Sequence, residues 1–185
     1  AVSDDSAIGS LEELILRASA EPDTISMGAN LGAPSHFVGL QLQAAAQVEP
    51  PPEFRFIPSG GGSDRIAALA GHHIDCSAFS VQEYTTFREQ GLRALCILSA
   101  DRHPGLPEIP TAREQGIDVT FSNIQYWWAP RGTPEAVVRT VSAALEAALA
   151  TPEVAERLGQ LYLKPTFIDG DALQAELTRR MELAS

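Results

Sequence analysis

The chain has 185 residues, of which 44% are hydrophobic, and its 24 acidic and 13 basic side chains give a formal net charge of -11. A chain of this length can bury a hydrophobic core. Its excess negative charge repels nucleic acids and anionic membrane surfaces, which argues against both as partners. No stretch reaches the length of apolar sequence that a transmembrane helix needs. Any anion that this protein binds must therefore be held by groups close to it.

The first part of the chain alternates predicted strands with predicted helices. Ser10 and Glu13 have the spacing of a capping box, which predicts that a helix begins there. Three strand-loop-helix units follow, over residues 24–47, 54–71 and 73–91, and the apolar run at 92–100 predicts a fourth buried strand. This alternation is typical of an α/β fold in which helices cover both faces of a mostly parallel, doubly wound sheet.

The pattern changes near residues 122–130, where helices begin to dominate. Extended runs are predicted at 118–121, 124–130 and 163–168. Helices are predicted to begin at the pairs Thr133-Pro134 and Thr151-Pro152, and a last helix is predicted over 171–184. We therefore expect a boundary that divides the chain into residues 1–123 and 124–185.

Two glycine-containing loops, NLGAPS at 30–35 and SGGGS at 59–63, each follow a predicted strand and precede a helix. Ligands bind beyond the carboxyl ends of parallel strands, where backbone amides and the positive ends of helices suit a carboxylate or a phosphate. The predicted ligand-binding residues are the donors Asn30, Gly32, Ala33, Ser35, Ser59, Gly60, Gly61 and Gly62, with Asp75, Ser77 and Phe79 at the end of the third strand. Tight turns without a ligand remain the alternative.

Known catalytic and metal-binding patterns are absent from the sequence. No lysine follows the glycines, as a Walker loop needs, and no GxSxG, HExxH or metal-spaced ligand set occurs. We therefore expect no metal and no cofactor. Asp75 lies in an apolar run, where it either caps a neighbouring loop or contacts the ligand. Cys76 and Cys96 are expected to be buried free thiols.

Several segments, in this order, resemble those of a known family of receptors. They are SLEELI at 10–15, GANLGAPSHF at 28–37, IPSGGGSDRIAALAGHHID at 57–75, SADRHPGLPEIPTAREQGIDV at 99–119 and APRGTPEAVV at 129–138. They are similar to the periplasmic solute-binding proteins of tripartite tricarboxylate transporters, or Bug-type receptors. The resemblance implies a two-lobed, type II periplasmic-binding-protein-like receptor that closes over a small carboxylate. It also implies a periplasmic location, membrane transporter subunits as partners, and no catalysed reaction.

Members of that family begin with a further segment that this sequence lacks. The resemblance therefore implies that residues 1–123 form the second lobe and that 124–185 form the C-terminal part of an incomplete first lobe. The apolar face of the predicted helix after Thr133, which includes Val137, Val138 and Val141, would then be exposed or covered by a second copy in a homo-oligomer. For the aromatic triplet at 126–128, core packing is the favoured interpretation, with a ligand cleft or a domain seam as the alternatives.

Two other classes of function remain open on the sequence. The first is a small flavodoxin-like enzyme that acts on a phosphorylated substrate bound at the same loops, with Asp64 or His36 as its acid or base. The second is a cytoplasmic ligand-sensing domain that is coupled to a partner. An enzyme needs a second titratable group that faces the glycine loop, whereas a receptor needs only donors.

Overall fold

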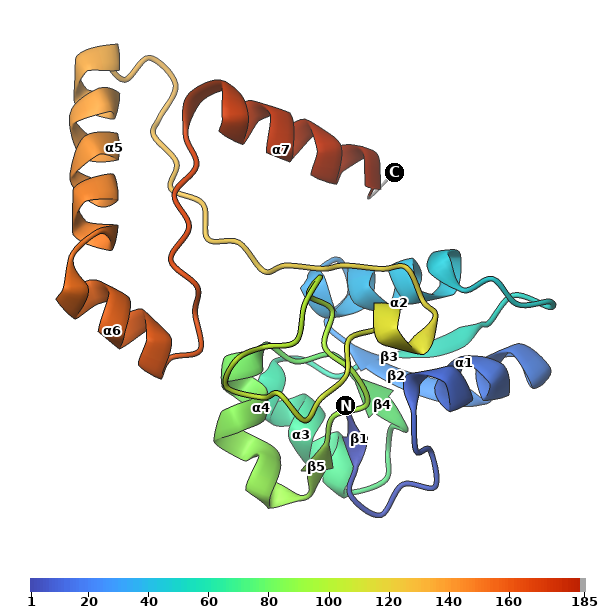
Figure 1. The fold of residues 1–185 in the computed structure, drawn as a ribbon. Helices are drawn as coiled ribbons and strands as arrows, with labels where there is room; N and C mark the ends of the chain where they lie inside the picture. Colours follow the sequence, from blue (N-terminus) through green and yellow to red (C-terminus); the bar gives the residue numbers. More distant parts are fainter. Residues whose placement is uncertain (184–185) are drawn as a thin grey trace. The chain divides into compact units, whose positions relative to one another are not determined.

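The computed structural model describes residues 1–183, and their contacts divide them into two compact units, residues 1–123 and 124 onward (Figure 1). The helices and strands of the first unit are β1 (Val2–Ser3), α1 (Leu11–Ala20), β2 (Ile25–Ala29), α2 (Pro34–Ala45), β3 (Phe54–Pro58), α3 (Gly62–Ala70), β4 (Cys76–Ser77), α4 (Val81–Phe87) and β5 (Leu92–Arg93), with short 3-10 helices at Arg88–Gln90 and Arg113–Gln115. The second unit contains α5 (Glu135–Leu149), α6 (Pro152–Gln160) and α7 (Gly170–Leu183).

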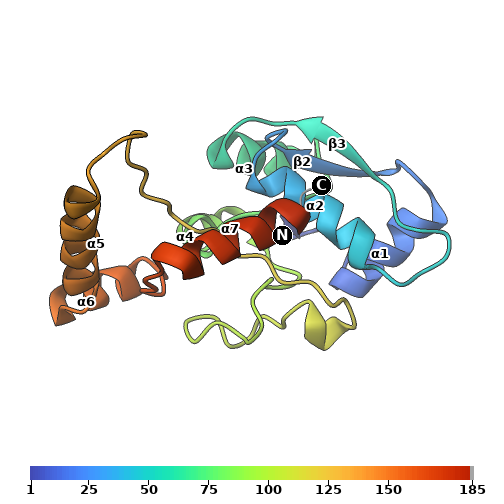
Figure 2. The same ribbon diagram turned by 90° about the horizontal axis from the view of Figure 1, so that it is seen from above.

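A parallel sheet in the order β3-β2-β4 forms the centre of the first unit. The register pairs Ile25 with Phe54 and continues to Ala29 and Pro58, so β2 and β3 end at the same edge. Figure 2 shows these two strands side by side. The predicted α/β fold with a parallel sheet is confirmed.

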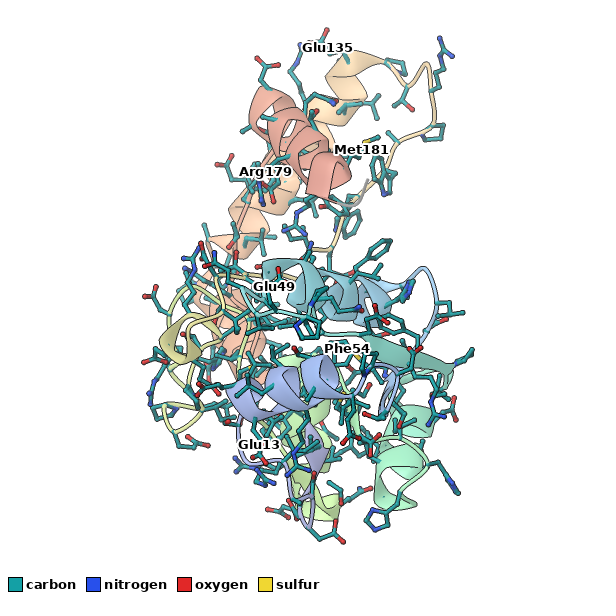
Figure 3. The ribbon with its side chains drawn as sticks, turned by 90° about the vertical axis from the view of Figure 1, so that its right-hand side faces the viewer. Glu13, Glu49, Phe54, Glu135, Arg179 and Met181 are labelled. Atoms are coloured by element: carbon teal, nitrogen blue, oxygen red, sulfur yellow. The ribbon has the colours of Figure 1, made fainter. Side chains whose placement is uncertain are left out.

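The two faces of the sheet pack against different helices. Ile25 and Met27 of β2 point into one hydrophobic cluster with residues of α1 and α2, and Phe54 of β3 joins it (drawn between α1 and α2 in Figure 3). On the other face Gly28 lies against Ile74, which packs in a second cluster with residues of α3. The period-two alternation of the strands therefore fixes which helix covers which face.

The prediction of a fourth strand in this sheet at 92–100 is wrong. Only Leu92–Arg93 is a strand, and it pairs antiparallel with β1. The free edge of β4 is already occupied, because Ser77 N donates to Ala1 O at 3.0 Å and Ala1 N donates to Ser77 O at 2.8 Å. An apolar run predicts that a segment is buried, but it does not predict which segment pairs with the free edge of a strand.

Most helix ends follow the predicted signals. Ser10 Oγ accepts from Glu13 N at 3.0 Å, as the capping box predicts. The Glu13 carboxylate, however, accepts from Gly9 N at 2.7 Å instead of from Ser10 N, so the second bond of the box is absent. Thr151 caps α6 as predicted. Pro134, predicted as the first residue of α5, is instead its N-cap.

The second unit departs from its prediction where strands were expected. Within the described residues, the runs at 124–130 and 163–168 are in no strand, since no described segment pairs with them. Trp127 and Trp128 are 74% and 75% exposed, so the predicted core packing of these rings is wrong. The helix predicted over 171–184 is present as α7, although Ala184 lies outside the described residues.

Both cysteines are free thiols, Cys76 buried and Cys96 half-buried. Burial raises the pKa of Cys76 from 9.0 to about 12 and also raises the pKa of Cys96. Since the thiolate is the reactive species, we expect Cys76 in a Cys96→Ser variant to resist thiol reagents at pH 8 until the chain unfolds.

The raised pKa of Cys76 also makes a pH dependence testable. Above pH 9 the unfolded chain releases the Cys76 proton, whereas the native state keeps it. The native state therefore loses stability as the pH rises from about 9 to about 12. Denaturant titrations of the same Cys96→Ser variant at several pH values measure this loss. Labelling of native Cys76 at the rate of a free thiol would contradict its burial.

Candidate functional site

Two loops meet at the carboxyl edge of the parallel sheet. Residues 30–33 connect β2 to α2, and residues 59–61 connect β3 to α3. Ser59 N donates to Ala29 O at 3.0 Å, and Ser59 Oγ donates to Ile57 O at 2.8 Å. Since parallel strands place their carboxyl ends together, the two predicted loops share one rim.

The start of α3 has backbone amides without acceptors. Its N-cap residue, Gly61, has no side chain with which to bond the following amides, and Gly61 N itself donates to Asp64 Oδ2 at 3.1 Å. In the described part of the chain, no acceptor bonds the amides of Gly60, Gly62, Ser63 and Asp64. These four amides, which we call the amide rim, lie at the positive end of a helix and can bind an anion.

The loop before α2 is mostly closed on itself. Asn30 N donates to Ser35 Oγ at 3.0 Å, Ala33 N donates to Asn30 O at 3.0 Å, and Gly32 N donates to His36 Nδ1 at 3.3 Å. Its backbone therefore offers fewer donors than predicted. Among the described residues, the Asn30 side-chain amide and the Ser35 N–H have no partner and remain available.

Arg65 contacts the loop that carries the amide rim. This residue was not predicted from the sequence as part of the site. It is 7% exposed, its Nη1 donates to Gly60 O at 3.0 Å, and its guanidinium carbon lies 5.3 Å from the centre of the Phe79 ring. Its Nε is buried without a hydrogen-bond partner. The buried guanidinium places a positive charge next to the Gly60 carbonyl of this loop. The sequence did not indicate that Arg65 is buried, because arginine side chains are mostly exposed in proteins.

The third strand places its predicted site residues differently from expectation. Asp75 precedes β4, so it lies at the amino end of the strand and not at its carboxyl end. Its Oδ2 accepts from both Ser26 N at 2.7 Å and Ser26 Oγ at 2.5 Å, so its carboxylate is bonded to strand β2 rather than to a loop. Ser77 Oγ donates to Gly28 O at 2.8 Å in a buried contact. Phe79, by contrast, lies against Arg65 and so near the rim.

Replacing Asp75 with alanine is expected to destabilise the chain and to leave ligand affinity unchanged. The substitution leaves the buried Ser26 N–H and hydroxyl without their acceptor, which costs about 1–3 kcal/mol. Denaturant unfolding measures the loss, and Asp101→Ala at an exposed position is the matched control. If Asp75→Ala lowered ligand affinity without lowering the free energy of unfolding, Asp75 would instead be a ligand-binding residue.

Metal sites, membrane-spanning helices and hollows are the other features of the described residues that bear on function. Among residues 1–183, no group of His, Cys, Asp or Glu side chains is placed to hold a metal ion. No described helix has the length and apolarity required to cross a membrane. An open hollow of about 550 Å³ in the second unit contains none of the predicted site residues, and it is lined by Phe167, Ile168, Asp169, Ala172, Ala175, Glu176 and Arg179 (Arg179 is labelled in Figure 3).

Comparison with known proteins identifies the family. Residues 1–178 match the family described as "Tripartite tricarboxylate transporter family receptor". A UPF0065 protein from the tcbD-tcbE intergenic region of a Pseudomonas species is 34% identical over 167 residues, which are 86% of this chain and 48% of that protein. The chain therefore spans about half the length of this curated relative.

Solved structures agree in fold. The periplasmic binding protein BugD is 28% identical with a TM-score of 0.73, over 97% of this chain and 60% of that one. MatC from Rhodopseudomonas palustris, solved with bound malate, is 25% identical with a TM-score of 0.75, over 100% and 65%. Rpa4515 from R. palustris, solved with adipate, is 23% identical with a TM-score of 0.83, over 99% and 62%, and shows the fold alone.

These matches also bear on the enzyme alternative left open by the sequence. The enzyme alternative is wrong, and its proposed acid or base groups have structural partners, with Asp64 bonded to Gly61 N and His36 bonded to Gly32 N. The chain belongs to the tripartite tricarboxylate transporter receptor family, which is a family of binding proteins and not of enzymes.

Proposed function

We propose that this chain is part of a periplasmic receptor that captures a small carboxylate and delivers it to the membrane subunits of a tripartite tricarboxylate-type transporter. The observation that carries the proposal is the amide rim, four N–H groups without acceptors at the start of a helix on the carboxyl edge of a parallel sheet. Backbone donors explain how a chain with a net charge of -11 binds an anion. The malate bound to MatC supports a carboxylate ligand.

Within this proposal the two units are parts of two lobes. Residues 1–123 form the second lobe of a type II periplasmic-binding-protein-like fold, and residues 124–185 form the C-terminal part of the first lobe. The remainder of the first lobe belongs to residues outside this sequence, which agrees with the 60–65% of the solved receptors that the chain covers.

The exposed face of α5 supports the assignment to a partial lobe. Val137, Val138 and Val141 are 50%, 43% and 47% exposed, and a helix with such a face normally packs on a sheet. In the isolated chain a second copy is the available cover, which makes a homo-oligomer the expected state. Size-exclusion chromatography with light scattering tests this, and a monomer that binds no dye specific for apolar surface would contradict it.

A thermal-shift screen tests the carboxylate ligand. Di- and tricarboxylates, amino acids, aromatic acids and sugar phosphates are compared at equal concentrations. Carboxylates are expected to raise the melting temperature, and the stabilisation of about 2.7 kcal/mol at a hundredfold excess over Kd should grow with the logarithm of concentration. High concentrations are needed, because half of an enclosing site binds weakly. Stabilisation by phosphates alone would overturn the proposal.

A further inference from the structure

We propose that Glu83 of α4 determines which carboxylates the amide rim accepts. It favours ligands that carry an ammonium group near the carboxylate, and it rejects ligands with a second carboxylate in that place. The inference rests on the proposed function, because it concerns the selectivity of the same site.

Glu83 reaches from α4 to the first residue of α3. A Cβ atom built on Gly62 would lie 2.1 Å from Glu83 Oε1, so this carboxylate oxygen lies directly against Gly62 within the rim. Only a residue without a side chain leaves the oxygen this room. The Glu83 carboxylate is thus a fixed neighbour of any anion held by the Gly62 and Ser63 amides.

The two oxygens of Glu83 have different environments. Oε2 accepts from Ser80 N at 2.8 Å and from Ser80 Oγ at 3.0 Å, which caps α4. Oε1 forms an ion pair with Arg65 Nη2 at 3.8 Å, which is beyond hydrogen-bond distance. The Glu83 side chain is 35% exposed, so Oε1 is an accessible acceptor with unused capacity.

The groups around the rim fall into donors and acceptors that lie side by side. The donors are the four amides. The Arg65 guanidinium beside them already bonds Gly60 O and Ala78 O, and its Nε is buried. The acceptors are Glu83 Oε1 and the Asp64 carboxylate, which is already bonded to Gly61 N. A ligand carboxylate suits the donors and an ammonium suits Oε1. A second carboxylate would face the negative charge of Glu83, while the Arg65 guanidinium is already bonded to Gly60 O and Ala78 O.

The test compares β-alanine with succinate, in which a carboxylate replaces the amine. Dissociation constants are measured by NMR titration for the unmodified chain and for Glu83→Gln, which keeps the cap on Ser80 because glutamine also closes a capping box. The unmodified chain is expected to prefer β-alanine by about tenfold or more, and Glu83→Gln is expected to lower that preference at least about tenfold by strengthening succinate binding. Glu89→Gln, which removes an exposed charge six positions further along the chain, is expected to leave the ratio within about twofold.

A second variant keeps the test valid if Glu83→Gln fails to fold. Gly62→Ala retains the amide but displaces Oε1, and it is expected to move the ratio in the same direction. An unchanged ratio in the folded variants, or a preference for succinate in the unmodified chain, overturns the role of Glu83 and leaves the receptor function standing. Binding of other carboxylates but of neither probe also overturns this role, whereas binding of no carboxylate overturns the receptor function itself.

Discussion

Replacing Gly39 with valine is expected to destabilise the first unit by about 1–3 kcal/mol, the usual range for forcing extra atoms into a packed core. Gly39 is buried in α2 where the helix lies against the sheet. A Cβ atom there would lie 2.5 Å from Phe56 Cε1 and 2.8 Å from Met27 Sδ. The Phe56 ring is also in contact with His36, with the ring centroids 4.7 Å apart and the ring planes at 87°.

Native-state hydrogen exchange of the β2 and β3 amides measures this loss, because it reports the opening of these strands alone. Leu40→Val is the matched control, since it places the same side chain at the next position of the helix, which is exposed. The control is expected to change the opening free energy by less than about 0.5 kcal/mol. If Gly39→Val behaves like the control, α2 does not pack as closely on the sheet as the structure indicates.

Replacing Ser63 with proline is expected to weaken ligand binding about 10- to 100-fold without unfolding the chain. The change removes one N–H of the amide rim, and a hydrogen bond to a charged acceptor contributes about 1.5–3 kcal/mol. Ser63 is exposed in the first turn of α3 and its N–H has no protein acceptor, so the fold loses no hydrogen bond. Proline is tolerated in the first turn of a helix for this reason.

Ser63→Ala separates the backbone from the side chain, since it removes the hydroxyl and keeps the N–H. Circular dichroism checks that both variants are folded, and NMR titration with a carboxylate gives their dissociation constants. If the rim acts through its amides, the alanine variant retains affinity and the proline variant does not. Equal losses in both would assign the binding to the Ser63 hydroxyl.

The sequence was sufficient to predict the parallel units because their signals are local. Strand, glycine loop and helix follow one another in β2–α2 and β3–α3, and each boundary has its own turn or cap chemistry. The place of residues 92–100 could not be predicted in the same way. It depends on Ala1 bonding Ser77, a contact across 76 positions of sequence.

The predicted site stays a prediction, and the structure changes which of its groups can donate. Glycine identifies amides that a ligand can approach, but it does not disclose which are already bonded within the protein. Gly61 N is taken by Asp64 and Ser59 N by Ala29, whereas the Ser63 and Asp64 amides are open. Side chains that arrive from a distance, such as Glu83, depend on packing between helices and leave no mark in the loop.

The amide rim is tested most directly by an NMR titration that follows each backbone amide as a small carboxylate is added. The amide protons of Gly60, Gly62, Ser63 and Asp64 are expected to move downfield together with one common dissociation constant. Those of Ser59 and Gly61, which already donate to Ala29 and Asp64, are expected to move far less. Four unmoved rim amides at saturating ligand, with shifts confined to residues elsewhere, would contradict the account.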